Sequence, residues 1–256
     1  MHRRVRKVEA IEVTLDRKFQ IEGVGVLVLK KIALIWDIDG TLLNTSGVGV
    51  IPFEIAVTNE TRLIAKLDRK RFSGFTDFQI AKTMLETIDY PLRTTEVLEK
   101  ILITYTNSLK EALIKRPAKP IGEIPAVLRQ LRDSKSFLSL IGTGNYKPGA
   151  HAKLESAGLK EFFTDENIFC TTSQSQLRTE ILLMAKQSLP EKYSGIVIGD
   201  SPSDIQASSE VGLKIICTAT GQHSREELMD YKPNLTLPDH WKYADLEKGI
   251  YKLENQ

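Results

Sequence analysis

The sequence predicts an α/β protein in which a doubly wound parallel sheet carries an inserted α-helical domain. Beyond residue 120, short apolar runs alternate with helical patterns, as in parallel sheets that helices cover on both faces. Between residues 50 and 116 the pattern is helical throughout and contains no convincing strand. The continuous apolar run Ile32–Trp36 indicates a buried strand, and three residues typical of a functional loop, Asp37, Asp39 and Gly40, follow it.

The composition indicates a folded chain and excludes several functions. Of the 256 residues, 41% are hydrophobic and 27% are charged, which argues against disorder. The net charge of +2 gives no case for nucleic-acid binding. No apolar run reaches the length of a membrane span, so we expect no membrane partner. The two cysteines, Cys170 and Cys217, lie in apolar surroundings without metal-ligand spacing, which predicts a reducing, cytoplasmic location.

The elements follow in order along the chain. Residues 1–30 form an N-terminal extension of open role, for which an extra hairpin and a disordered segment are equally compatible with the pattern. In the helical insertion, Ile80, Met84, Leu85 and Ile88 share one helix face. After it we expect helices at 124–132, 150–157, 180–187 and 205–211, and strands at 137–141, 196–198, 213–217 and 234–237.

Three polar loops follow three of the apolar strands, at residues 37–40, 142–145 and 199–204. In open α/β sheets, ligands bind beyond the carboxyl ends of the strands. We therefore expect the three loops to meet in one crevice.

The residue types in these loops predict a site for phosphate and a divalent cation. Asp37 and Asp39 are two positions apart, which places both side chains on one side of an extended segment. Asp200 and Asp204 add two carboxylates, and Mg²⁺ is a hard ion that takes oxygen ligands. Thr143 offers a hydroxyl to a phosphate, and backbone N–H groups beside it complete the predicted substrate contacts, at Gly142, Gly144 and Asn145.

These loops resemble the signature motifs of the haloacid dehalogenase superfamily. Asp37–Leu42 is similar to its first motif, Gly142–Asn145 to its second and Gly199–Asp204 to its fourth. The likeness extends from Ile32 to at least Gly221. It implies a Rossmann-like catalytic core over residues 31–46 and 120–256, with a helical cap over residues 47–119, as in the phosphoglycolate-phosphatase-like branch.

The resemblance also implies a role for each site residue. Asp37 would be the nucleophile that becomes an aspartyl-phosphate, and Asp39 the general acid and then the general base. Thr143 would hydrogen-bond the transferring phosphoryl group. Asp200 would hold Mg²⁺ with Asp37 and the backbone carbonyl of Asp39. Asp204 would support the metal either as a direct ligand or by contacting another ligand.

The third motif is usually a lysine, and here Arg178 stands at the expected place. Arginine can bridge carboxylate and phosphate with its fork of donors, so the replacement is chemically sensible. Lys186 is the alternative, although it lies two turns into the predicted helix.

A segment of the insertion, residues 72–80, resembles a Gly-x-Thr-Asp segment of such caps. Thr76 and Asp77 are candidates for substrate contact or for helix capping. Phe75 stands where a polar or basic residue could contact an anionic substrate, which disfavours a strongly anionic leaving group.

We therefore predict a Mg²⁺-dependent phosphatase that hydrolyses a small phosphorylated metabolite. The alternatives are a sugar-phosphate phosphomutase, which would share Asp37 and Asp39, and a non-catalytic binding protein on the same scaffold. A dehalogenase is disfavoured, because that chemistry does not need Asp39 as a proton donor. The sequence indicates neither the natural substrate nor the oligomeric state.

Overall fold

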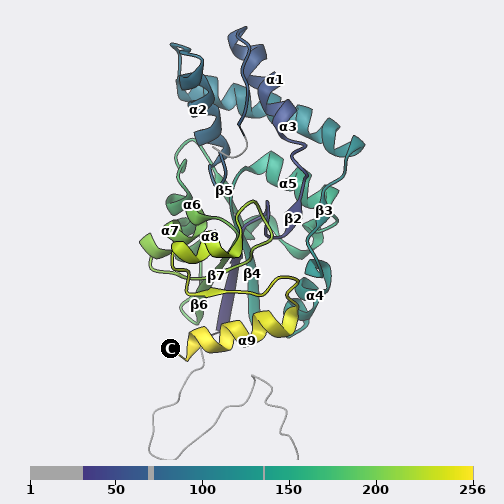
Figure 1. Cartoon of the computed structure of the whole chain (residues 1–256), viewed down its shortest axis with the longest axis vertical. Helices are drawn as coiled ribbons and strands as arrows, with labels where there is room; N and C mark the ends of the chain where they lie inside the picture. The colour runs from purple at the N-terminus through teal and green to yellow at the C-terminus, as the bar shows by residue number, and fades with distance from the viewer. Residues whose placement is uncertain (1–30, 69–71, 135, 256) are drawn as a thin grey trace, which may run out of the picture.

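Six parallel strands form the central sheet in the order β5-β4-β1-β6-β7-β8 (Figure 1). This computed structural model describes residues 31–68, 72–134 and 136–255, so the extension predicted for residues 1–30 lies outside the described residues. The strands are β1 Lys31–Trp36, β4 Phe137–Tyr146, β5 Ile168–Thr171, β6 Tyr193–Gly199, β7 Lys214–Cys217 and β8 Leu235–Thr236. Because β4 and β6 flank β1 on opposite sides, the sheet is doubly wound, which confirms the predicted fold class.

The alternation of side chains along β1 divides the core into two layers. Ala33 and Ile35 face one side of the sheet, whereas Ile32, Leu34 and Trp36 face the other. Three helices cover the first side: α6 Arg178–Gln187, α7 Pro202–Glu210 and α8 Arg225–Asp230. Three others cover the second side: α4 Ile124–Ser134, α5 Lys147–Ser156 and α9 Tyr243–Glu254. Two short 3₁₀ turns, Lys160–Phe162 and Asp165–Asn167, connect α5 to β5.

The insertion between β1 and β4 consists of three helices that lie beyond one end of the sheet, at the top of Figure 1. They are α1 Val50–Thr61, α2 Asp77–Thr87 and α3 Thr95–Lys115. Two short strands, β2 Leu43–Asn44 and β3 Lys119–Pro120, pair where the chain leaves and re-enters the sheet region. The helical prediction for this stretch is confirmed. Within the described ranges, no helix has both the length and the apolar character that crossing a membrane would require.

Polar contacts hold this insertion against the sheet domain. The carboxylate of Asp77, in the first turn of α2, accepts a hydrogen bond from the backbone N–H of Tyr146 at 2.7 Å. The Thr76 hydroxyl donates to the carbonyl of Gln176 at 2.6 Å. Gly144 permits this approach, because a Cβ there would lie 3.0 Å from the Cα of Thr76. The insertion therefore meets the second predicted loop directly.

The second predicted loop is in fact part of a strand. We expected a strand that ends at Ile141, but β4 continues to Tyr146 and includes Gly142–Asn145. The extension arises because β5, which the sequence analysis did not identify, pairs with β4 as far as Tyr146 across an irregular register. The final helix α9 was likewise not identified, although its buried residues follow a helical period.

Gly142 has a packing role that predicts a measurable cost of substitution. A Cβ at this position would lie 2.7 Å from Ile35 Cγ2 and 3.1 Å from Leu182 Cδ2, atoms of one core layer. We expect Gly142→Ala to lower the free energy of unfolding by about 1–3 kcal/mol, because the core must shift to accept the methyl group. Urea titration followed by circular dichroism measures this change.

Gly149→Ala is the matched control for this substitution. A Cβ at Gly149 in α5 would make its closest contact, 3.4 Å, with Thr106 Cγ2, which is ordinary packing. Alanine also favours helix over glycine, so this variant should be neutral or gain up to about 1 kcal/mol. Equal effects of the two substitutions would contradict the packing role of Gly142.

The burial of Asp77 predicts a pH-dependent stability. Burial raises the pKa of Asp77 from 3.8 to about 6, and the charge of Lys153 and the Tyr146 hydrogen bond only partly offset this. At this group the folded state then binds more protons than the unfolded state, so the contribution of Asp77 to stability falls as the pH rises between about 4 and 6. Relative to Asp77→Asn, the wild type should lose at most about 3 kcal/mol over that range. Denaturant titrations of both proteins from pH 4 to 8 test this, and a constant difference would contradict it.

Candidate active site

Three carboxylates that are distant in the sequence meet at the carboxyl ends of β1 and β6. Asp37 directly follows β1, Asp200 directly follows β6, and Asp204 lies in the first turn of α7. Each offers one oxygen that lies within 4.8 Å of the others, and all three residues are buried. The structure thus brings together the first and third predicted loops, as the shared edge of the strands led us to expect.

Asp200 lies between two glycines. A Cβ at Gly40, whose φ is +87°, would lie 2.3 Å from Asp200 Oδ2, and a Cβ at Gly221 would lie 1.7 Å from the same atom. Thr41 Oγ1 donates a hydrogen bond to Asp200 Oδ1 at 2.9 Å. Side chains at either glycine position would therefore displace the carboxylate. The sequence analysis did not single out Gly221, because the loop after β7 carries no recognisable motif.

Arg178 is the first residue of α6 and joins two of the carboxylates. Its Nη2 lies 2.8 Å from Asp37 Oδ1, and its Nε donates to Asp204 Oδ1 at 2.8 Å. Although burial lowers the pKa of Arg178, the carboxylates of Asp204 and Asp37 raise it above its ordinary value. The alternative cation, Lys186, lies elsewhere: its Nζ donates to the carbonyl of Val211 at 2.7 Å on an exposed surface.

Asp204 orients this arrangement through a full set of hydrogen bonds. Its Oδ2 accepts from Ser201 Oγ at 2.7 Å and from the backbone N–H groups of Ser201 and Asp200 at 3.1 and 3.3 Å. Its Oδ1 accepts from Arg178. Asp204 therefore fixes both the loop and the arginine, and Asp37 and Asp200 accept fewer hydrogen bonds, which leaves them more lone pairs for a cation.

The electrostatics of the cluster fit a divalent cation. Three carboxylates and one guanidinium leave two negative charges uncompensated. Burial, opposed by Arg178 and assisted by Asp204 and Asp39, raises the pKa of Asp37 to about 6. Burial and the nearby Asp37 also raise the pKa of Asp200 well above its usual range. An oxygen-preferring divalent ion bound to Asp37 and Asp200 would offset this repulsion.

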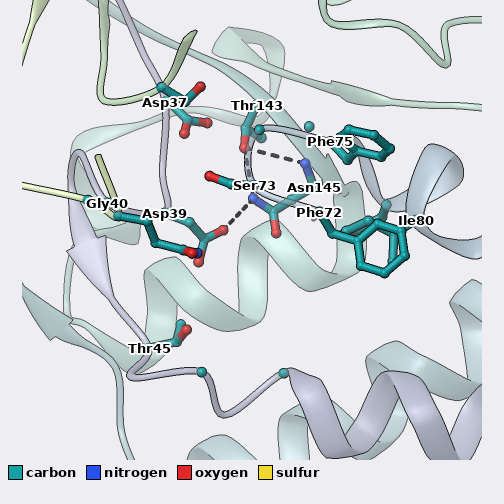
Figure 2. A pocket seen from close by; sticks show the side chains of 18 of the residues that line it. Asp37, Asp39, Gly40, Thr45, Phe72, Ser73, Phe75, Ile80, Thr143 and Asn145 are labelled. Atoms are coloured by element: carbon teal, nitrogen blue, oxygen red, sulfur yellow. Dashed lines mark hydrogen bonds between the residues drawn. The ribbon is translucent and has the colours of Figure 1, made fainter. Parts of the chain in front are cut away.

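Asp39 lies apart from the three clustered carboxylates and is partly exposed. Its Oδ2 accepts hydrogen bonds from Asn145 Nδ2 at 2.8 Å and from Lys153 Nζ at 2.6 Å (Figure 2 shows the Asn145 bond). Its carboxylate is not part of the cation cluster, so any metal contact of Asp39 is left to its backbone carbonyl, as the resemblance implied.

Lys153 is a site residue that the sequence analysis missed. It lies in α5 and is only 6% exposed, with the carboxylate of Asp39 as its ion-pair partner. Burial lowers the pKa of Lys153, but Asp39, Tyr105 and Asp77 raise it above its ordinary value, so the side chain stays charged. The sequence did contain one signal for its burial. Lys153 lies four residues after Gly149 and three after Ala150, which places it on the apolar face of the predicted helix.

The second predicted motif contributes two polar side chains to the site. Thr143 is fully buried, and its Oγ1 accepts from Asn145 Nδ2 at 2.8 Å (Figure 2). Thr143, Gly144 and Asn145 line the cavity described below, whereas Gly142 does not and packs against the core. The hydroxyl proton of Thr143 is therefore available to an oxygen in the cavity.

The site opens into a cavity of about 300 Å³ between the insertion and the sheet domain. Asp37 and Asp39 lie on one side of it, and Phe72, Phe75 and Ile80 lie on the other (Figure 2). Of the two cap candidates, Asp77 lines the cavity but Thr76 does not. The Thr76 hydroxyl instead accepts from the backbone N–H of Gln79 at 3.2 Å and donates to Gln176, which is a capping role.

Solved structures of other proteins resemble this chain in fold. A predicted phosphatase from Clostridium acetobutylicum superposes with a TM-score of 0.65 at 20% identity, over 87% of this chain and 99% of its own. A β-phosphoglucomutase from Clostridium difficile gives 0.65 at 16% identity, over 88% and 99% of the two chains. A predicted phosphoglycolate phosphatase from Haemophilus somnus gives 0.59 at 17% identity, over 87% and 98%. At these identities the likeness establishes the fold alone.

Sequence comparison supplies the family. No curated protein sequence matches the chain significantly. Residues 34–218, however, match the model of the haloacid dehalogenase-like hydrolases, and the matched segment includes all the carboxylates of the site. Since this match covers most of the chain, the protein belongs to the haloacid dehalogenase-like hydrolase family.

Proposed function

We propose that this protein is a Mg²⁺-dependent phosphatase that hydrolyses a small phosphorylated metabolite through an aspartyl-phosphate on Asp37. The observation that carries the proposal is the position of Asp37 in the lining of the cavity, 2.8 Å from Arg178 and beside Asp200. Asp37 is suited to attack a phosphate, because Arg178 and a cation on Asp200 would neutralise the negative charge around it. Phosphoryl transfer depends mainly on such positioning and charge neutralisation.

The reaction proceeds in two balanced steps. In the first, a carboxylate oxygen of Asp37 attacks phosphorus, the bond between phosphorus and the leaving oxygen breaks, and Asp39 donates its proton to that oxygen. In the second, water attacks the phosphorus of the aspartyl-phosphate and passes a proton to Asp39. The bond between Asp37 and phosphorus then breaks and releases inorganic phosphate.

The other site residues hold the phosphoryl group during both steps. Arg178 donates to Asp37 and can bridge to a phosphoryl oxygen with its remaining N–H groups. Thr143 presents its hydroxyl to the same group from β4. Mg²⁺, held by Asp37 and Asp200 with the backbone carbonyl of Asp39, would supply positive charge to the phosphoryl oxygens.

The cavity favours phosphatase over phosphomutase activity. A phosphomutase must bind the second phosphate of a bisphosphorylated intermediate, which requires additional positive charge. Among the described residues that line the cavity, the basic side chains are Arg178 and Lys153, and carboxylates pair with both. A non-catalytic role is disfavoured by the same geometry, since a binding protein does not need a buried carboxylate held 2.8 Å from Arg178 in the lining of the cavity.

The insertion favours a leaving group without strong charge. Its contribution to the cavity wall is mainly apolar, from Phe53, Leu67, Phe72, Phe75 and Ile80. Such a wall binds the apolar part of a metabolite. We therefore propose a phosphoglycolate-phosphatase-like architecture whose substrate is less anionic than a phosphorylated acid.

Turnover should depend on a divalent metal and on Asp37. We expect the protein to release p-nitrophenol from p-nitrophenyl phosphate with Mg²⁺, and to lose this activity in EDTA and regain it with added Mg²⁺. Asp37→Asn should lower kcat at least about a thousandfold, because the amide is a poor nucleophile. Glu191→Gln, an exposed carboxylate remote from the cavity, is the control. Undiminished turnover in EDTA or in Asp37→Asn would contradict the proposal.

Asp39→Asn should separate proton transfer from metal binding. We expect kcat for an alkyl phosphate to fall by about 100-fold to 10,000-fold, which is the usual contribution of general acid–base catalysis. Mg²⁺ affinity should change little, because the Asp39 carboxylate lies outside the cation cluster. Isothermal titration with Mg²⁺ and steady-state kinetics measure the two quantities. Unchanged kcat would contradict the proton-transfer role.

A further inference from the structure

Lys153 has contacts that the motif-based assignment of roles does not explain. We propose that Lys153 is a positioning residue for Asp39: it holds Oδ2 of that carboxylate and thereby presents Oδ1 to the leaving-group oxygen. The inference rests on the proposed function, because it concerns the proton transfer that Asp39 performs there.

The contacts of Lys153 fix one end of the Asp39 carboxylate. Lys153 Nζ lies 2.6 Å from Asp39 Oδ2 and also donates to Asn145 Oδ1. Asn145 Nδ2 donates to the same Asp39 oxygen at 2.8 Å and to Thr143 Oγ1 at 2.8 Å. Lys153 and Asn145 therefore hydrogen-bond to each other and both donate to Oδ2 of Asp39. These contacts do not involve Oδ1 of Asp39, which can face the cavity.

The burial of the two partners is unequal, which distinguishes this ion pair from a core salt bridge. The Lys153 side chain is 8% exposed, whereas the Asp39 side chain is 38% exposed. A buried ammonium is costly without a partner, so the pairing holds Lys153 firmly in place. The charge is thus fixed in the wall of the cavity, where it acts on a carboxylate that still reaches substrate.

Lys153 and Arg178 contact different carboxylates of the site. The guanidinium of Arg178 contacts Asp37 and Asp204, and the ammonium of Lys153 contacts Asp39 and Asn145. The two cations come from different helices on opposite faces of the sheet, α6 and α5. The nucleophile and the proton-transfer group therefore each have their own cationic neighbour.

The consequence for catalysis depends on the leaving group. In the first step the bond from phosphorus to the leaving oxygen breaks, and the proton of Asp39 passes to that oxygen. An alkoxide needs this proton, whereas p-nitrophenolate is weakly basic and departs without it. A misoriented Asp39 should therefore slow alkyl phosphates far more than p-nitrophenyl phosphate.

The test compares kcat/KM for these two substrates in Lys153→Met, because kcat/KM reports the first chemical step. With an alkyl phosphate such as phenylethyl phosphate, we expect a loss of about 10-fold to 100-fold, since small misplacements have such effects. With p-nitrophenyl phosphate we expect a loss below about threefold. Lys147→Met, an exposed lysine of the same helix that lies outside the cavity, should leave both values unchanged.

A double mutant tests whether Lys153 acts through Asp39. In the Asp39→Asn background, Lys153→Met should cause no further loss with the alkyl phosphate, because the group that it positions no longer donates a proton. Equal losses on both substrates, or additive losses in the double mutant, would overturn the inference. Lys153→Gln serves as a second variant that retains a hydrogen-bond donor, and it should lose less than Lys153→Met while keeping the wild-type melting temperature.

Failure of the proposed function and failure of this inference would appear in different experiments. The former would appear in the wild type, as absence of Mg²⁺-dependent phosphate release. Failure of the present inference would appear in an active enzyme, as an unchanged ratio between the two substrates.

Discussion

The concentration of buried negative charge at the end of β1 is the constraint on which the rest of the site depends. Asp37, Asp200 and Asp204 are each less than a tenth exposed, and such a cluster is stable only with compensating charge. Arg178 supplies part of it from α6. The remaining negative charge suits a divalent cation, and in the proposed reaction that cation would help to bind the phosphate.

Glycines and hydrogen bonds make this concentration sterically possible. Gly40 and Gly221 leave room for the Asp200 carboxylate, and a Cβ at Gly199 would lie 2.6 Å from Asp204 Cγ. The insertion then lines the same cavity with mainly apolar side chains, opposite the charged residues of the sheet domain. The charged groups nevertheless lie in a largely buried setting, where hydrogen bonds and ion pairs become stronger.

Much of this arrangement could be predicted from sequence because its signals are local. A β-strand followed by Asp-x-Asp-Gly is a pattern that a purely structural role rarely requires. The cavity where the three loops were expected to meet is lined by the predicted residues Asp37, Thr143, Arg178 and Asp200. Other expectations depended on partners that were not visible. Gly142–Asn145 belongs to a strand because β5 pairs there, and Thr76 is withdrawn from the cavity because Gln176 accepts its hydroxyl. The domain boundaries and the roles of residues remain predictions.

The fold class, the helical nature of the insertion and the identity of the chemical groups could be predicted from the chain, because periodicity and short motifs act over neighbouring residues. Which of these groups meet depends on packing between distant segments. Lys153 follows Asp39 by 114 residues and reaches it only because α5 packs under β4, so no spacing in the chain could reveal the pair. Asp204 likewise accepts hydrogen bonds from Ser201 and Arg178, and the contact with Arg178 forms only when α6 and α7 pack side by side.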